Sequence, residues 1–101
     1  MEREFDISTF VDVLTEDKVL CNLVNRMIKK RKAMKITQKK LAMMSGVSYG
    51  SVKRFELTGE ISLRSLLKIA SALDSLEGFE KLFSEITIRN VKELFYDKWS
   101  K

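Results

Sequence analysis

The sequence predicts an all-α fold, and three observations support this prediction. The 101 residues include no Pro and only 4 Gly, which is typical of helices joined by short turns. Apolar residues recur at intervals of three and four along most of the chain, as in helices with one buried face. Ser or Thr precedes most of these stretches, where a hydroxyl can accept a hydrogen bond from the first helical turn. With 45% hydrophobic and 33% charged residues, the chain can bury one modest core.

The composition also excludes several kinds of protein. The chain has one Cys, Cys21, and no His, which excludes an internal disulfide, a Cys/His metal site and His-based catalysis. No nucleophile stands at a recognisable spacing from a base, and no Gly-rich phosphate loop is present, so we expect neither an enzyme nor a cofactor. The chain shows no membrane-spanning apolar run and no secretory signal, so we expect a cytoplasmic location, with Cys21 as a small core residue.

The positive charge is concentrated in one part of the chain. The net charge is +5, yet no acid occurs between Asp17 and Glu56, an interval that holds 11 of the 19 basic residues. A basic block flanked by acidic ends is typical of nucleic-acid binders, because clustered Lys and Arg displace the counterions of a phosphate backbone. The alternative is an ordinary solvated helix face.

The N-terminal part of the chain contains the first predicted helix. Residues 1–14 form an arm or a short helix, whose apolar side chains pack either on the domain or in a dimer. A helix then begins at Thr15, with acids in its first turn, and ends in the basic run 29–32, as the helix dipole favours. Its core stripe comprises Leu20, Leu23, Val24, Met27 and Ile28.

Residues 37–59, TQKKLAMMSGVSYGSVKRFELTG, predict two short helices joined by a tight corner. Thr37 and Ser48 are suited to cap the helices, and Gly46 and Gly59 to end them, since Gly adopts positive φ without steric cost. The residues expected to face the core are Leu41, Ala42, Val47, Val52 and Phe55, with Met43 and Met44 as core filler. The opposite face of the second helix carries Tyr49, Gly50, Lys53 and Arg54, with Ser51 at its edge. This is a helix-turn-helix, whose second helix is narrow enough for a DNA major groove about 12 Å wide.

Three further helices are predicted after Gly59. Ser62 caps a helix whose apolar face is made by Leu63, Leu66, Leu67, Ile69, Ala70 and Leu73. Residues 76–86 read as a short helix with Phe79, Leu82 and Phe83 pointing inward. A last helix over 88–99 carries an apolar stripe that either folds back over the first helix or, as we expect, forms a homodimer interface through Ile88, Val91, Phe95 and Trp99.

The motif TQKKLAMMSGVSYGSVKRFE closely resembles the phage-repressor (Xre/lambda Cro-like) family. The pattern T-Q-x-x-L-A-x-x-x-G-V-S-x-x-x-[VI]-x-x-[FIW]-E is matched at every position, and the resemblance extends from Asn22 to about Leu73. It implies a lambda-repressor-like DNA-binding domain of about five helices with an added C-terminal helix. The expected division is an N-terminal segment 1–14, the DNA-binding domain 15–75 and a C-terminal extension 76–101.

The resemblance also implies roles in DNA binding. Tyr49 occupies a position where the family carries a base-reading side chain, and Gly50 departs from the usual polar residue there. A phenol can make one hydrogen bond or pack on a thymine methyl, whereas Arg54 can make a bidentate contact to guanine or hold a phosphate. The expected base-reading residues are Tyr49, Gly50, Lys53 and Arg54. The expected phosphate-backbone contacts are Arg31, Lys32, Lys35, Gln38, Lys39, Ser51, Thr58, Ser62 and Arg64. We expect Glu56 to have a structural role, fixing the turn or a nearby Arg, because phosphate repels a carboxylate.

Two functions therefore compete. The first is a sequence-specific DNA-binding regulator, a repressor that acts as a homodimer on double-stranded DNA. The second is an antitoxin that binds a toxin protein and represses its own operon, because GVSYGSVKRFELTGEISL is similar to regulators of the HipB kind.

Overall fold

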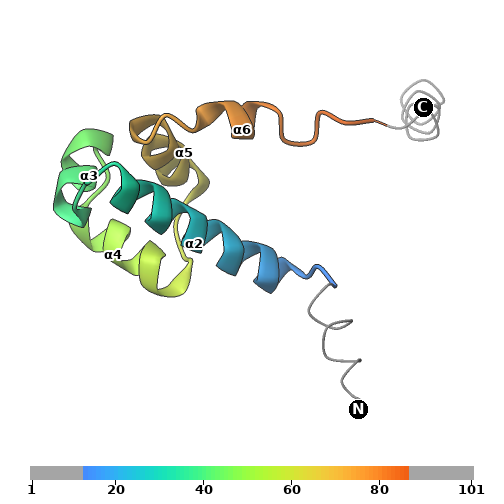
Figure 1. Cartoon of the computed structure of the whole chain (residues 1–101), viewed down its shortest axis with the longest axis horizontal. Coiled ribbons are helices and arrows are strands. Elements are labelled where there is room, and N and C mark those ends of the chain that lie inside the picture. The colour runs from blue at the N-terminus through green and yellow to red at the C-terminus, as the bar shows by residue number, and fades with distance from the viewer. Residues whose placement is uncertain (1–12, 87–101) are drawn as a thin grey trace, which may run out of the picture.

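The protein is a bundle of short α-helices. A computed structural model describes residues 13–86, and within them it contains five helices and no strand. The helices are α2 (Glu16–Ala33), α3 (Gln38–Ser45), α4 (Tyr49–Thr58), α5 (Leu63–Ala72) and α6 (Leu76–Glu80) (Figure 1). The all-α fold is confirmed. Residues 1–12 of the predicted N-terminal arm or short helix (1–14) and the predicted dimer helix with Ile88, Val91, Phe95 and Trp99 lie outside the described residues.

Four of the five described helices begin directly after the hydroxyl cap that the sequence predicts. In each, the capping hydroxyl accepts a hydrogen bond from the backbone N–H three residues further on, over 3.0–3.1 Å. The four caps are Thr15, Thr37, Ser48 and Ser62. Each such bond satisfies an amide that would otherwise have no partner in the helix, which stabilises the fold by about 1 kcal/mol.

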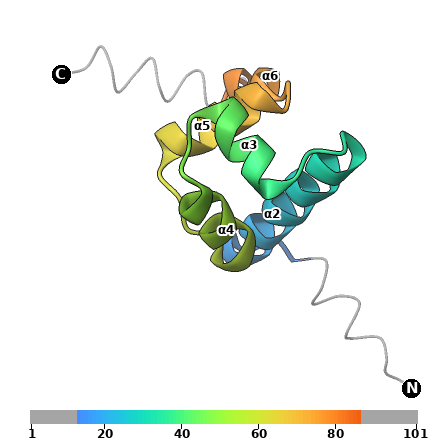
Figure 2. The same ribbon diagram turned by 90° about the vertical axis from the view of Figure 1, so that its left-hand side faces the viewer.

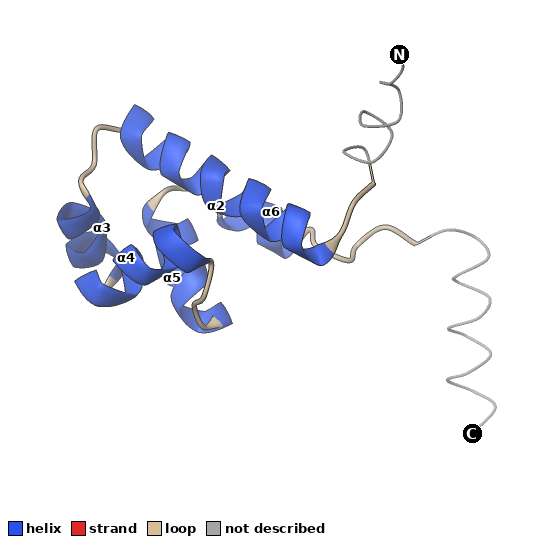
Figure 3. Ribbon diagram, turned by 90° about the horizontal axis from the view of Figure 1, so that it is seen from below, coloured by secondary structure: helices blue, strands red, loops and turns tan. Residues whose placement is uncertain are grey.

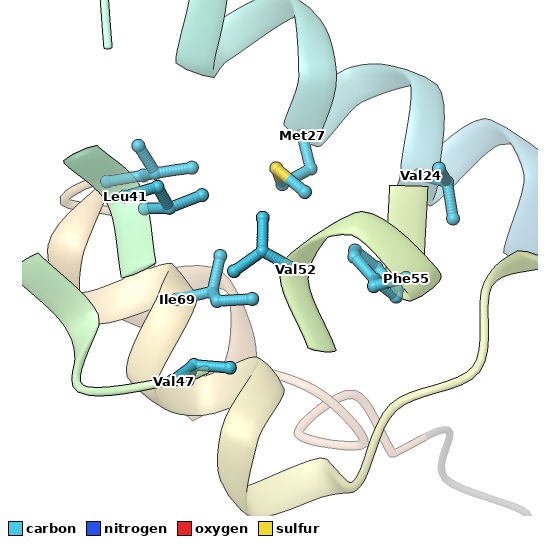
Figure 4. Close-up of a cluster of buried hydrophobic side chains, with 8 residues drawn as sticks. Val24, Met27, Leu41, Val47, Val52, Phe55 and Ile69 are labelled. Atoms are coloured by element: carbon cyan, nitrogen blue, oxygen red, sulfur yellow. The ribbon is translucent and has the colours of Figure 1, made fainter. Parts of the chain in front are cut away.

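The core lies where α2, α3, α4 and α5 meet (Figure 4). Leu41, Val52, Phe55 and Ile69 have no exposed surface, and each contributes on the order of 2 kcal/mol through burial. The cluster is completed by Val24, Met27, Val47 and Leu73. The predicted inward faces of the two motif helices are therefore confirmed, and the core holds these helices in a fixed relation.

Other side chains expected in the core are exposed. Met43 is 80% and Met44 45% exposed, and Cys21 also lies at the surface. Successive residues of a helix are about 100° apart around its axis. Because Leu41 points directly into the core, Met43 falls near the far side of α3 and Met44 at the edge of its buried face. Both methionines and Cys21 were wrongly assigned to the core.

The end of the described chain also differs from the prediction. Helix α6 stops at Glu80 instead of continuing to residue 86, and Leu82 and Phe83, predicted to point inward, are 58% and 92% exposed. Ser75 makes no side-chain capping bond to α6, and Gly78 lies in its interior, where Gly costs about 1 kcal/mol relative to Ala. A helix with so little local support remains one short turn.

Helix α4 lies away from the C-terminal part of the bundle. Helix α4 packs against α2 and α3, and α6 packs against α5. Figures 1 and 2 place α4 and α6 at opposite ends of the bundle, and Figure 3 shows the bundle from below with α2 as its longest helix. The surface of α4 that points away from the core is therefore not covered by α6.

Candidate nucleic-acid interface

A three-residue corner, Gly46 to Ser48, sets the direction of α4. Gly46 has a φ of 77°, in the left-handed region, and its amide donates to Ala42 O over 2.9 Å. The amide of Val47 donates to Ser45 Oγ over 3.2 Å, while its side chain is only 5% exposed. Ser48 then caps α4. The corner is thus satisfied by its own hydrogen bonds and anchored by one buried side chain.

Helix α4 presents its predicted outer face to solvent. Tyr49 is 39% exposed, Gly50, Lys53 and Arg54 are exposed, and Ser51 is half-buried at the edge. Over its ten residues the helix is about 15 Å long, and its diameter of about 10–12 Å matches the width of a DNA major groove. The four predicted base-reading residues therefore share one accessible surface.

Lys39 belongs to the same surface although it lies on α3. Its Nζ is 5.6 Å from the centre of the Tyr49 ring, and Lys53 Nζ is 4.9 Å from it. Such cation–π contacts contribute about 0.5–1 kcal/mol at exposed sites. They place one predicted backbone contact, Lys39, beside two predicted base-reading residues and restrict the tyrosine between two positive charges.

Arg54 is paired within the chain. Its Nε donates to Glu60 Oε1 over 3.0 Å, and its Nη2 contacts the same oxygen, with side chains that are 68% and 64% exposed. The sequence did not indicate this partner. Thr58, predicted to touch phosphate, donates its hydroxyl to Arg54 O over 2.8 Å and accepts from the Glu60 amide over 3.1 Å.

A buried ionic network lies behind the interface. Arg31 is 7% exposed, and its Nε and Nη2 donate to the two carboxylate oxygens of Glu56 over 2.7 and 3.0 Å. Its Nη1 donates to Ile36 O over 2.8 Å, and Gln38 Nε2 donates to Glu56 Oε1 over 2.8 Å. Glu56 therefore fixes a nearby Arg, as expected. The burial of Arg31 contradicts its expected phosphate contact, because all three guanidinium nitrogens are already bonded inside the domain.

The remaining predicted contacts lie around the end of α2 and the start of α5. Lys32 and Lys35 are exposed around the end of α2, and Ser62 and Arg64 are exposed at the start of α5. The Ser62 hydroxyl accepts the Ser65 amide over 3.1 Å. These residues flank the helix-turn-helix in the chain, whereas Lys39 contacts the Tyr49 ring and Thr58 donates a hydrogen bond to the Arg54 carbonyl.

The corner at Gly46–Ser48 joins α3 to α4, and α4 exposes a basic face. This arrangement defines a helix-turn-helix DNA-binding protein. A model of the Helix-turn-helix family matches residues 27–79 of the 101, so the chain belongs to this phage-repressor-like family of DNA-binding regulators. No curated protein and no solved structure gives a significant match. In residues 13–86, no helix is both long and apolar enough to span a bilayer, and no three Cys, Asp or Glu side chains cluster as metal ligands would.

Proposed function

We propose that the protein is a sequence-specific regulator that places α4 in the major groove of DNA and represses transcription by occupying a promoter. The observation that carries this proposal is the division of α4 into two faces. Val52 and Phe55 are fully buried, while Tyr49, Lys53 and Arg54 point outward. A buried face fixes the helix on the domain, and the basic outer face is left for DNA.

The outer face supplies different means of reading bases. Arg54 is suited to a bidentate contact with guanine, which discriminates by about 1–3 kcal/mol, and Tyr49 to one hydrogen bond or a thymine methyl. Gly50 has open space where a side chain would begin, so the fold does not require glycine there. Its role in the proposal is to let the helix backbone approach the bases closely.

Contacts to phosphate would fix the register of α4 without reading sequence. Arg31 is left out because it is buried. The start of α5 offers backbone amides and a positive dipole end beside Ser62, which favour an anion. The proposed backbone contacts are Lys32, Lys35, Gln38, Lys39, Ser51, Thr58, Ser62 and Arg64.

The proposal includes a homodimer in the cytoplasm. Two protomers would read half-sites about 34 Å apart, one turn of the double helix. Their interface is proposed at Ile88, Val91, Phe95 and Trp99, on the strength of the apolar stripe in the sequence.

A second candidate is an antitoxin that binds a toxin protein and represses its own operon. Exposed apolar side chains at Leu82, Phe83 and Ile86 favour some protein partner. Purification with a second, different protein would support the antitoxin, whereas purification as a plain homodimer would support the simple regulator.

Selection of bound fragments from a random duplex library, followed by affinity measurements, tests the proposal. The wild type should enrich one motif and bind it at least about 10³-fold more tightly than random duplex. Arg54→Ala should relax the preference at one base pair per half-site. Lys81→Ala is the matched control, because Lys81 is an exposed base at the other end of the bundle. Failure to bind duplex DNA at low salt, or binding without sequence preference, would refute the proposal.

A further inference from the structure

The Arg54–Glu60 pair leaves one edge of the guanidinium available. Nε and Nη2 form the side-on edge, and both contact Glu60 Oε1. The other edge consists of Nη1 and the second hydrogen of Nη2, and no hydrogen bond joins Nη1 to any of residues 13–86. This free edge is a pair of parallel N–H donors, which is the arrangement that O6 and N7 of guanine accept.

The backbone of Glu60 is held in place by α4 itself. Gly59 turns the chain with a φ of 83°, and its amide donates to Phe55 O over 2.8 Å. The Glu60 amide then donates to Thr58 Oγ1, whose hydroxyl donates to Arg54 O. The carboxylate therefore returns to Arg54 from a turn that is tied to the carbonyl of Arg54, so the pair does not depend on two unconstrained surface chains.

We propose that Glu60 is a positioning residue that determines specificity at the base read by Arg54. This inference rests on the proposed function. Both side chains are more than half exposed, so the pair changes the folding equilibrium by no more than a few-fold. Its effect falls on Arg54, because Glu60 restricts a side chain that otherwise has many rotamers and leaves only the base-reading edge available.

Glu60 also opposes non-specific binding. A guanidinium already neutralised by a carboxylate attracts phosphate less strongly, and the carboxylate is itself repelled by the DNA backbone. Contact with a correctly placed guanine uses the free edge and keeps the ion pair intact. A wrong base or a phosphate alone makes a weaker contact with the paired arginine. Glu60 therefore increases the difference between specific and non-specific affinity.

The test compares wild type with Glu60→Ala, Glu60→Gln, Arg54→Ala and the double variant Arg54→Ala/Glu60→Ala. Each is titrated with the duplex selected by wild type, with the three duplexes substituted at the Arg54-dependent base pair, and with random duplex at several salt concentrations. Thermal unfolding confirms that each variant is folded. Glu77→Ala is the matched control, because Glu77 is an exposed acid that pairs with Lys81 on α6.

Glu60→Ala should reduce discrimination at that base pair by about 5- to 10-fold, a part of what a bidentate arginine supplies. It should also raise the affinity for random duplex by a few-fold and steepen the salt dependence by about one ion per protomer. Glu60→Gln keeps an acceptor oxygen, so it should lose less discrimination than Glu60→Ala. In the Arg54→Ala background, removing Glu60 should leave discrimination at this base pair unchanged.

The outcomes separate this inference from the proposed function. If Arg54→Ala relaxes the preference but Glu60→Ala does not, the positioning role is wrong and the DNA-reading function stands. A loss of discrimination at this base pair that Glu60→Ala still causes without Arg54, an equal loss in Glu60→Gln, or the same changes in Glu77→Ala would also overturn it. If wild type shows no sequence preference, or if its preference survives Arg54→Ala, Arg54 does not read a base. Glu60 would then have no base-reading arginine to position.

Discussion

Glu56→Ala should destabilise the domain more than the removal of any exposed charge. The change deletes the carboxylate that accepts from Arg31 Nε at 2.7 Å, from Arg31 Nη2 at 3.0 Å and from Gln38 Nε2 at 2.8 Å. The side chains of Arg31 and Glu56 are only 9% and 8% exposed, so water cannot fully replace the lost partner. Arg31 would keep its charge and only the Ile36 carbonyl. Leaving a buried charge without its counterion costs about 3–5 kcal/mol.

Thermal and urea unfolding, followed by circular dichroism, measure this cost. A loss of 3–5 kcal/mol corresponds to a decrease in Tm on the order of 20 °C for a domain of this size. Glu77→Ala is the control, since the Glu77 side chain is 82% exposed and its loss should change stability by less than about 1 kcal/mol. Arg31→Met/Glu56→Leu should cost less than Glu56→Ala, because it leaves no buried charge. If the free energy of unfolding of Glu56→Ala lies within 1 kcal/mol of that of wild type, the network does not hold the helices together.

Four other substitutions have defined expected results. Gly46→Ala and Gly59→Ala should each lose about 1–2 kcal/mol in urea unfolding, because both positions have positive φ. Gly59→Ala should lose more stability, since its new Cβ would lie 3.0 Å from Leu20 Cδ2, whereas nothing lies within 4 Å of a Cβ at Gly46. Equal losses of stability would show that Leu20 moves aside without cost. Lys39→Ala should weaken binding to all duplexes similarly and lower the salt slope by about one per protomer, and an unchanged slope would remove Lys39 from the interface. Trp99→Ala should shift the protein toward monomer in sedimentation, a result that a monomeric wild type or an unaltered dimer would contradict.

The parts of the fold that were predictable from sequence depend on local signals. A capping hydroxyl acts on an amide three residues away, and Gly46 and Gly59 end their helices through their own φ. The division of α4 into buried and exposed faces follows from helical periodicity. The exposed face of α4 could therefore be predicted from the sequence.

Most of the features that were missed depend on contacts between distant segments. Arg31 reads as one more base in a basic run, and only its approach to Glu56, 25 residues later, shows that it is buried. The pairing of Glu60 with Arg54 requires the left-handed turn at Gly59 and the hydrogen bonds of Thr58. The exposure of Met43 depends on which side of α3 meets α5, and the early end of α6 on the weakness of its own capping.

The buried network has a consequence for how such a chain can diverge. Arg31, Gln38 and Glu56 come from three different helices, and the carboxylate of Glu56 accepts hydrogen bonds from both of the other side chains. Replacement of Arg31 or Glu56 alone leaves the other charge buried without its counterion, whereas a coordinated exchange of both for apolar residues does not. In descendants of this gene we therefore expect the codons of Arg31 and Glu56 to be retained together or to change together, and an alignment in which they vary independently would show that the restraint is absent.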